Sequence, residues 1–305
     1  MNVVVIGATG LVGSALVQQL NRQYNITAVG RDERLVRQKF PFCKSLALQD
    51  LALKHLAECD VVINLAGENI SKGRWNESRR AEIIDSRVST TQQVVELCRK
   101  LDQDAPRVFN ASAIGIYGLQ ETSSSLSDAF VEESELPNPP TDFLSEVAIG
   151  WENTLRFLDP EKVVKLRFAV VLARHGGALP KLAMPFYFGC GGPIASGQQA
   201  ISWVALKDVV SAITFLLDRP LLWGAFNIVA PECLHQRQFA RVLARVLKRP
   251  SFMWTPGFFL KLLYGQMAEE LILQGQHVEP KRLLDVGFEF QYGDLDTALR
   301  DIYRD

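Results

Sequence analysis

The chain has 305 residues, of which 48% are hydrophobic and 22% charged, as is ordinary for a soluble globular protein. This length allows one large domain or two smaller ones, and a formal net charge of -1 argues against binding to nucleic acid or to an anionic membrane surface. The five cysteines are scattered and show no CxxC spacing, so the sequence predicts neither a disulfide framework nor a zinc site, and it suits a reducing compartment.

The apolar stretches of the chain bear on its localisation. The opening segment MNVVVIGATG has no basic region, and its apolar run is too short for a signal peptide. The longest apolar stretches elsewhere are too short to span a bilayer. We therefore expect a cytoplasmic protein with no membrane partner. The only low-complexity run is at residues 122–125, and no internal repeat is found.

Short β-branched runs alternate with amphipathic segments through the first half of the chain. The predicted strands are 3–6, 26–29, 46–48, 61–65, 107–111 and 163–168. The helices predicted among them are 11–20, 51–57, 79–101 and 145–158. Strict alternation of this kind predicts an α/β fold with a parallel, doubly wound sheet of Rossmann type.

The second half of the chain changes character. Glycine and proline punctuate 176–193, and the helices predicted near the end are 239–247, 258–263, 267–273, 280–285 and 295–302. We expect a cofactor-binding core at 1–168 and a smaller, mostly helical substrate-side portion made of 169–206 and 231–305. No polar linker separates the two, so we expect 207–230 to return to the core sheet as a helix and a strand.

A glycine-rich loop joins the first predicted strand to the first predicted helix. Gly7 permits a tight turn, Gly10 lets the backbone approach a pyrophosphate, and Gly13 lets the helix pack closely on the sheet. The start of the helix presents free N–H groups and a positive dipole end to the phosphates. In this setting the pattern predicts a bound dinucleotide rather than a ligand-free turn. The expected contact residues are Gly7, Thr9, Gly10, Leu11, Val12 and Gly13.

The end of the second predicted strand distinguishes between the two nicotinamide cofactors. An acidic residue there would bind the ribose 2′-hydroxyl of NAD, but the chain has Arg31 at this point and Asp32 one position late. A guanidinium can engage a 2′-phosphate with two hydrogen bonds. The sequence therefore favours NADP(H) over NAD(H), and the alternative is that Arg31 is an ordinary surface arginine.

A second segment is expected to lie against the cofactor. Leu65, Ala66 and Gly67 follow the predicted strand 61–65, and ligands bind at the carboxyl ends of strands in such sheets. Small residues there let a cofactor lie across the end of the strand. The alternative is a plain turn from strand to loop.

These motifs carry a resemblance to a known family. The glycine loop, the strand DVVI followed by NLAGE at 64–68, and ASAIGIYG at 111–118 resemble an extended short-chain dehydrogenase/reductase. GGPIASGQQ at 191–199, ISWVALKDV at 201–209, RW at 74–75 and PKRL at 280–283 are similar to an atypical, NAD-dependent epimerase-like branch with its own C-terminal domain. Bacterial members are labelled epimerase family or cell-division-inhibitor-like proteins. The resemblance covers nearly the whole chain and implies an NADP(H)-binding fold, with a reaction that is poorly defined.

The resemblance also implies a catalytic apparatus that this chain has only in part. Typical members use a serine, a tyrosine and a lysine four residues later, whose charge lowers the pKa of the tyrosine so that it transfers a proton while hydride moves. Ser112 matches the serine. The helix that should carry the other two offers only apolar pairs, Phe143 with Val147 or Leu144 with Ala148, and Arg87 replaces the usual asparagine of the proton relay.

Other side chains are candidates for the missing roles. Tyr117 could replace the acid or be structural, and Glu68 could be a base or a solvated carboxylate. Arg74 and Arg87 could bind an anionic substrate or form surface salt bridges, and Trp75 beside them could contact a ring or pack in the core. Asp142 and Glu146 are more typical of a solvated helix face, and Arg167 of either a cleft or a structural pair.

Two functions follow from these observations. The first is an NADP(H)-dependent oxidoreductase or epimerase-like enzyme that acts on a small carbonyl, hydroxyl or sugar-nucleotide-like compound, with Ser112 and Tyr117 as its catalytic candidates. The second is a non-catalytic NADP(H)-binding regulator or partner-binding protein, related to cell division. We expect a monomer or a homodimer, a small-molecule substrate, and no metal.

Overall fold

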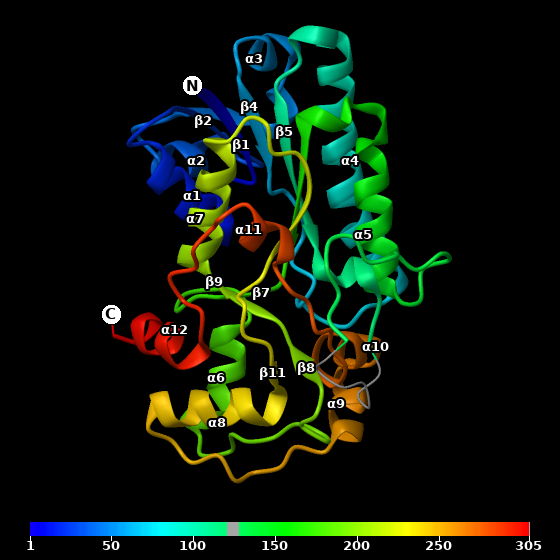
Figure 1. Ribbon diagram of the computed structural model, residues 1–305, viewed down its shortest axis with the longest axis vertical. Helices are drawn as coiled ribbons and strands as arrows, with labels where there is room; N and C mark the ends of the chain where they lie inside the picture. The colour runs from blue at the N-terminus through cyan, green and yellow to red at the C-terminus, as the bar shows by residue number, and fades with distance from the viewer. Residues whose placement is uncertain (121–127, 305) are drawn as a thin grey trace.

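The main sheet of the computed structural model, which describes residues 1–120 and 128–304, has seven strands in the order β10-β6-β5-β4-β1-β2-β3 (Figure 1). Every neighbouring pair in this sheet is parallel. The order reverses direction between β1 and β4, which confirms the predicted doubly wound α/β class. The low-complexity run at 122–125 lies outside the described residues. The strands are β1 (Asn2–Ile6), β2 (Asn25–Gly30), β3 (Lys44–Ala47), β4 (Val61–Asn64), β5 (Arg107–Ala113), β6 (Val163–Phe168) and β10 (Gly224–Ile228).

Helices cover both faces of this sheet (Figure 1). On one face lie α1 (Leu11–Leu20) and α7 (Leu206–Leu217), which contact each other; α3 (Leu53–Ala57), α4 (Glu77–Leu101) and α5 (Phe143–Asn153) lie on the other. Alternate strand residues point to opposite faces, so Val3 and Val5 join the core under α1, whereas Val4 and Ile6 join the core under α4. The short helix α2 (Glu33–Lys39) follows β2.

A smaller portion lies beyond the carboxyl ends of the strands. Its helices α6 (Leu179–Tyr187), α8 (Gln236–Leu247), α9 (Gly257–Tyr264), α10 (Gln266–Ala268) and α12 (Leu295–Ile302) accompany two short strand pairs. In one pair β7 (Val170–Leu172) runs parallel to β9 (Trp203–Ala205), and in the other β8 (Ala200–Ile201) runs antiparallel to β11 (Leu234–His235). Trp203 is fully buried in the core of this portion, beside Phe186 and Phe239.

One segment of the C-terminal part returns to the main body. Val278, Leu283 and Phe288, in and around α11 (Lys281–Asp285), belong to the main core, and Arg282 Nη1 donates to the carbonyl of Ala225 in β10 at 2.6 Å. The sequence pattern predicts that the whole of 231–305 belongs to the substrate-side portion. These contacts join residues far apart in the chain, so hydrophobic periodicity does not detect them.

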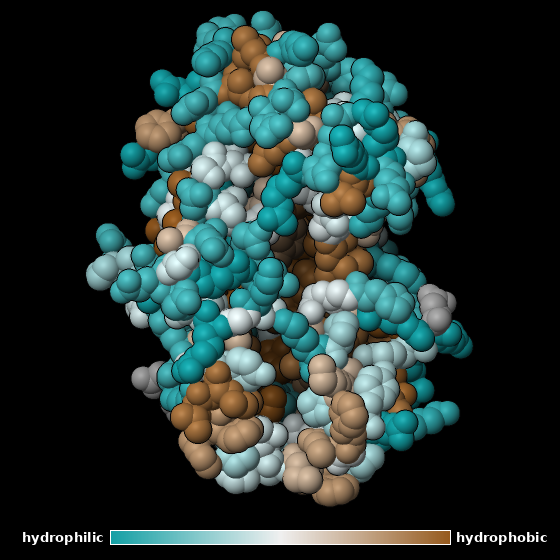
Figure 2. All heavy atoms as spheres, turned by 180° about the vertical axis from the view of Figure 1, so that it is seen from behind, coloured by the Kyte–Doolittle hydropathy of each residue, from teal (hydrophilic) through white to brown (hydrophobic). Residues whose placement is uncertain are grey.

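The surface of the smaller portion is unusually apolar at one helix. In α9, Phe258 is 74% exposed and Leu262 is 70% exposed, and hydrophobic side chains gather on the lower part of the back face on both sides of a hollow (Figure 2). None of the helices in the described ranges combines the length and the apolar character needed to cross a bilayer.

Candidate functional site

The glycine loop after β1 has the shape that a dinucleotide requires. Gly7 has a φ of 78°, and a Cβ on it would lie 2.8 Å from the carbonyl of Leu65. A Cβ on Gly13 would lie 2.3 Å from the Gly7 oxygen, so the helix packs on the loop at a distance only glycine allows. The N-cap of α1 is Gly10, which has no side chain to bond the first N–H groups of the helix. These groups and the helix dipole therefore suit a phosphate, as the sequence predicts.

Three loops meet at the carboxyl edge of the sheet around this helix start. The backbone of Leu65 and Ala66, after β4, lies against Gly7. Gly177, after β7, lies beside Leu11, because its Cβ would be 3.1 Å from Leu11 Cδ2. The predicted cofactor residues of the first and second loops are thus brought together, and the turn at Gly176 and Gly177 lies next to them.

Basic side chains lie by the glycine loop and by the loop that follows β4. Arg31 is highly exposed and forms an ion pair with Glu68, which lies after β4. Arg79 Nη2 is 3.5 Å from the second carboxylate oxygen of Glu68. Lys39, which lies in no sequence motif, donates from Nζ to Thr9 O at 3.1 Å and to Ser14 Oγ at 2.6 Å. Two basic side chains, Arg31 and Arg79, thus pair with one carboxylate, and Lys39 contacts the glycine loop and the start of α1.

The carboxylates of Asp32, next to Arg31 in the chain, and of Glu68 have different roles. Asp32 is the N-cap of α2 and accepts a hydrogen bond from Arg34 N at 2.8 Å, which accounts for its position one residue late for a ribose contact. Burial alone would raise the pKa of Glu68, but the charges and hydrogen bonds of Arg31 and Arg79 lower it below its ordinary value. Glu68 is therefore ionised at neutral pH.

Arg87 lies beneath the loop that carries Gly67. Its Nη1 donates to the carbonyl of Ile83 at 2.9 Å and its Nη2 to the carbonyl of Glu68 at 3.1 Å. The guanidinium carbon lies 5.2 Å from the centre of the Trp151 ring. Burial lowers the pKa of Arg87 to about 10. Arg87 thus supports the shape of the cofactor-edge loop with two backbone carbonyls rather than with a carboxylate.

The residues Arg74 and Trp75 have different surroundings. Arg74 is exposed, and its side chain forms no hydrogen bond or ion pair with the residues that the structure describes. Trp75 is buried, donates from Nε1 to Ile70 O at 2.7 Å and meets the Phe143 ring edge-on with centroids 4.9 Å apart. Trp75 therefore packs in the core and does not face a substrate, whereas Arg74 is available to an anion.

Ser112 and Tyr117 lie in a buried ionic network. Ser112 Oγ donates to Glu152 Oε1 at 2.7 Å, and Glu152 is paired with Arg167 through an Nε–Oε1 distance of 2.9 Å. The Tyr117 hydroxyl accepts from Arg167 Nη1 at 2.8 Å and donates to Asn227 Oδ1 at 2.7 Å. Both hydroxyls selected as catalytic candidates are therefore bonded to protein groups in the interior.

The titration of this network follows from burial and from the arginine. Burial raises the pKa of Tyr117, and the neighbouring charge of Arg167 only partly offsets this. Burial alone would also raise the pKa of Glu152, but hydrogen bonds and charge from Arg167, and the charge of Lys165, lower it below its ordinary value. The phenol is thus neutral and the carboxylate ionised at neutral pH, which is the arrangement of a structural salt bridge.

The helix α5 carries no tyrosine or lysine at the expected places. Phe143 and Val147 are buried in a cluster with Trp75, and Leu144 faces Gly115 after β5. Asp142 caps the helix by accepting from Ser145 N at 2.9 Å.

Two further carboxylates lie at this end of α5, and neither points to a reaction site. Glu146 is exposed and is 3.3 Å from Arg80. Glu270 of the C-terminal part accepts hydrogen bonds from the first two N–H groups of α5, those of Phe143 at 3.3 Å and Leu144 at 3.0 Å. Glu270 thus caps the start of α5, and Glu146 forms a surface ion pair.

Two residues of these networks, Glu152 and Lys39, went undetected in the sequence for different reasons. Glu152 follows Trp151 on the apolar face of a predicted helix, and a lone charge in that position is a sign of a buried pair. Lys39 is the last residue of α2, a helix that lies outside the predicted elements. A basic residue near the end of a helix that follows the second strand would have been the sign to look for.

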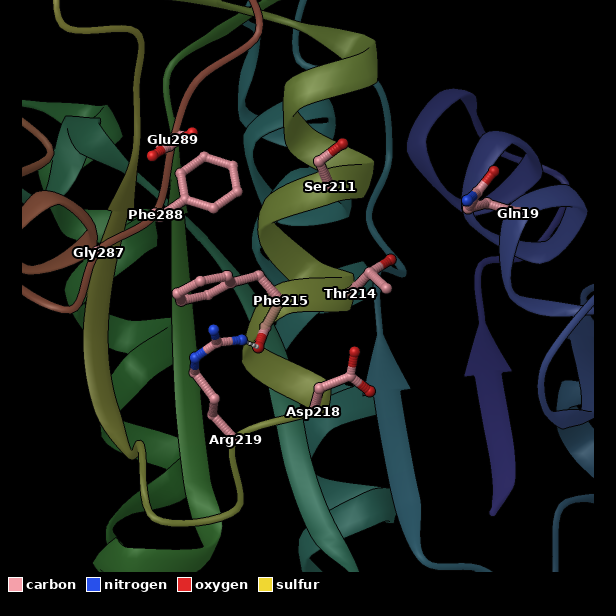
Figure 3. A pocket seen from close by; sticks show the side chains of 9 residues that line it. All are labelled: Gln19, Ser211, Thr214, Phe215, Asp218, Arg219, Gly287, Phe288 and Glu289. Carbon is pink, nitrogen blue, oxygen red and sulfur yellow. Dashed lines mark hydrogen bonds between the residues drawn. The ribbon is translucent and has the colours of Figure 1, made fainter.

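A separate hollow of about 440 Å³ lies between α1, α7 and residues 287–289 (Figure 3). Arg219 lines it but donates from Nη1 to the Phe215 carbonyl at 3.1 Å and stacks on the Phe215 ring (Figure 3). The lining residues Gln19 and Asp218 come from the ends of α1 and α7 away from the glycine loop.

Within the described ranges, no group of three or more histidine, cysteine, aspartate or glutamate side chains could hold a metal ion.

Comparison with protein families gives two matches. Residues 3–143 match the NAD dependent epimerase/dehydratase family, and residues 255–302 match a domain of unknown function, DUF1731. An epimerase family protein of Staphylococcus haemolyticus is 36% identical over 302 residues, covering 98% of this chain and 97% of the relative. The epimerase family protein YfhF of Bacillus subtilis is 34% identical over 309 residues, covering 100% and 99%.

Among solved structures, the human epimerase family protein SDR39U1 (isoform 2) with NADPH superimposes with a TM-score of 0.87 at 32% identity. The match covers 100% of this chain and 99% of the human chain. Full-length similarity at this level confirms the resemblance drawn from the glycine loop and the later motifs. The chain belongs to the NAD-dependent epimerase/dehydratase family, in the form that carries a C-terminal DUF1731 domain.

Proposed function

We propose that the protein binds NADP(H) at the glycine loop and acts as an oxidoreductase or epimerase-like enzyme on a small carbonyl, hydroxyl or sugar-nucleotide-like compound. The observation that carries the proposal is the close approach of Gly7 and Gly13 to neighbouring backbone, together with the uncapped start of α1. A Cβ at either glycine would close the cradle that a pyrophosphate needs. The NADPH in the human relative is consistent with this site.

The charges at the carboxyl edge favour the phosphorylated cofactor. Arg31 and Lys39 lie beside the glycine loop. Arg31 directly follows β2, at the position where a protein that binds NAD would have an acidic residue. Both basic side chains are suited to a 2′-phosphate, which carries up to two negative charges. Thr9, Leu11 and Val12 line the turn into α1, and Leu65, Ala66 and Gly67 would lie along the dinucleotide. NAD(H) would lack the partner for these cations.

Bound NADPH would supply a hydride to a carbonyl carbon, or NADP would accept one from a carbinol. The protein's contribution would be binding, orientation and electrostatics. Arg74, which is exposed and without a partner among the described residues, is suited to an anionic group of the substrate. Arg87 holds the loop that carries Gly67 and Glu68. Ser112 and Tyr117 then act by holding the end of β5 in place.

Binding and turnover can be measured separately. Titration calorimetry should detect NADPH binding, and Arg31→Ala should weaken NADPH more than NADH. A panel of carbonyl compounds and sugar nucleotides, followed by NADPH absorbance, should then give turnover with a narrow set of substrates and little with common aldehydes. Tight NADPH binding without turnover across the panel would remove the catalytic part of the proposal.

A second candidate is a non-catalytic NADP(H)-binding regulator or partner-binding protein, one version of which acts in cell division. The observation that favours it is the commitment of both Ser112 and Tyr117 hydroxyls to the Glu152–Arg167 network. Affinity capture with NADP or with NADPH present distinguishes it: a partner whose binding depends on the redox state supports regulation. Binding indifferent to the cofactor contradicts it.

The remaining expectations concern assembly and location. We propose a cytoplasmic monomer or homodimer whose partner is a small molecule rather than nucleic acid or a membrane. The formal charge of -1 argues against a nucleic-acid or membrane partner. Light scattering after gel filtration gives the mass of the assembly, and cell fractionation gives the compartment.

A further inference from the structure

We propose that Glu68 is a cofactor-selectivity residue, because its carboxylate competes with the 2′-phosphate of NADP(H) for the Arg31 guanidinium. The inference rests on the NADP(H) site proposed above and goes beyond it by assigning a role to an acidic residue. In the free protein the carboxylate takes the place on Arg31 that the phosphate takes in the complex.

The ion pair crosses the place where the adenosine half of a dinucleotide lies in this fold. Arg31 follows the last residue of β2, and Glu68 lies in the loop after β4. The sheet order puts β1 and its glycine loop between these two strands. The pair therefore joins the two sides of the cofactor groove over its floor.

Glu68 is the fixed member of the pair and Arg31 the free one. The Glu68 N–H donates to Ser86 Oγ at 3.0 Å, and its carbonyl accepts from Arg87 Nη2 at 3.1 Å. Its side chain is 24% exposed, against 85% for Arg31, which has no other charged partner among the described residues. A ligand arriving at Arg31 thus meets a guanidinium already bonded to an anchored carboxylate.

The competition lowers the affinity for the 2′-phosphate of NADP(H) and has little effect on the affinity for NAD(H), which has a hydroxyl at that position. A phosphate monoester carries about 1.5 to 2 negative charges near neutral pH, and it must share Arg31 with Glu68 or displace it. A ribose hydroxyl carries no charge and feels the carboxylate far less. Lys39 bonds Thr9 O and Ser14 Oγ and forms no ion pair within the described residues, so its charge stays available. Affinity for the phosphate therefore persists although Glu68 opposes it.

The experiment measures binding with four probes: NADPH, NADH, 2′,5′-ADP and 5′-AMP. Each is titrated calorimetrically into the wild-type protein, Glu68→Gln and the control Glu82→Gln. Glu82 is a matched control because its carboxylate pairs with Arg79 at 2.7 Å but does not touch Arg31. Circular dichroism melting checks that both variants fold as the wild type does.

We expect Glu68→Gln to tighten NADPH and 2′,5′-ADP by about two- to fivefold, the range that an exposed ion pair supports. NADH and 5′-AMP should stay within about twofold of wild type, and Glu82→Gln should change none of the four. In an Arg31→Ala background, Glu68→Gln should no longer alter the ratio of NADPH to NADH affinity.

Three results would overturn the inference. Weaker NADPH binding in Glu68→Gln would mean that the carboxylate positions Arg31 for the phosphate instead of competing with it. Equal changes for NADPH and NADH would mean that Glu68 acts only through the shape of its loop. A wild-type protein that binds none of the four probes would overturn the proposed cofactor site itself, and the competition with it.

Discussion

Arg167 on β6 and Glu152 on α5 form a bidentate ion pair in the interior of the protein. The Nε–Oε1 distance is 2.9 Å and the Nη2–Oε2 distance is 3.0 Å, with side chains 5% and 4% exposed. Ser112 donates a hydrogen bond to Glu152, and Tyr117 accepts one from Arg167. Ser112, which matches the catalytic serine of the family, and Tyr117, the candidate for the missing acid, are thereby bonded to a buried salt bridge that joins the sheet to α5.

Replacement of Glu152 by glutamine should strongly destabilise the fold. The change leaves Arg167 buried with its charge uncompensated, which costs about 3 kcal/mol in comparable pairs. Urea unfolding measures the loss. Glu146→Gln is the control, because Glu146 lies on the same helix and pairs with Arg80 at the surface, and it should cost less than about 0.5 kcal/mol. Similar losses for the two variants would contradict the assignment of the pair.

Tyr117→Phe should affect stability more than function. The phenol bridges Arg167 and Asn227, so its removal leaves buried polar groups without a partner and should lower the free energy of unfolding by about 1–3 kcal/mol. NADPH affinity should stay within about twofold. On any substrate that the panel identifies, turnover should fall less than tenfold, whereas loss of a general acid typically costs about 10² to 10⁴. A loss in the latter range would restore Tyr117 as the acid.

The fold was predictable because its signals are local. Buried strands such as Val61–Asn64 are short apolar runs, and α1 begins directly after a glycine loop. Helix α6 was missed because prolines lie within it, at Pro180 in the first turn and at Pro185 in the interior. Proline is tolerated in a first turn, and the rest of the helix packs on the smaller core. Tertiary contact there overrides a local pattern.

The candidate site was predictable only where it is contiguous in the chain. The glycine loop needs no distant partner to be seen in sequence. The Tyr117–Arg167 bond joins residues 50 positions apart, and the Tyr117–Asn227 bond joins residues 110 positions apart. A single sequence shows such residues as an isolated tyrosine, arginine and asparagine, so their network appears only once the strands are aligned.

Gly13→Ala should damage cofactor binding and stability together. The new Cβ would lie 2.3 Å from the Gly7 oxygen, so the loop must shift away from the helix. NADPH affinity should fall by at least about tenfold, because the first N–H groups of α1 move out of reach of the phosphates. Calorimetry and thermal melting measure the two effects.

Gly150→Ala is the matched control for this change. A Cβ on Gly150 would meet nothing within 4 Å, and the residue lies inside α5. Alanine is favoured over glycine in a helix interior by about 0.5–1 kcal/mol, so this variant should be slightly more stable and bind NADPH normally. Loss of NADPH binding in both variants would mean that glycine substitution harms the protein irrespective of place.

Lys39→Met should weaken NADPH more than NADH. Its ammonium lies against Thr9 O and Ser14 Oγ, where a 2′-phosphate of a bound cofactor could reach it, and a charged hydrogen bond of this kind is worth about 1.5–3 kcal/mol. We expect about a tenfold loss for NADPH and a smaller one for NADH. Arg37→Met removes the same charge from the same helix at a residue paired with Glu33, and should change neither. Equal losses for both variants would point to net charge rather than to contact.

The acid limit of stability should depend on Glu152. Although burial opposes it, Arg167 lowers the pKa of this carboxyl in the folded protein below the ordinary 4.5 that applies to the unfolded chain. A depressed folded pKa means that the stabilisation is complete above the unfolded value and is lost as the pH falls through the folded one, by at most about 1.4 kcal/mol per pH unit.

The gap in unfolding free energy between wild type and Glu152→Gln isolates this contribution from that of other carboxyls, such as Glu132, whose pKa is raised by burial. We expect the gap to be constant well above the ordinary carboxyl pKa of 4.5 and to shrink as the pH falls below it, since a protonated Glu152 resembles glutamine. Urea unfolding of both proteins across this range measures it. A gap that stays constant to the lowest pH at which both proteins fold would show that Glu152 is not the group that titrates, and that Arg167 draws its stability from another partner.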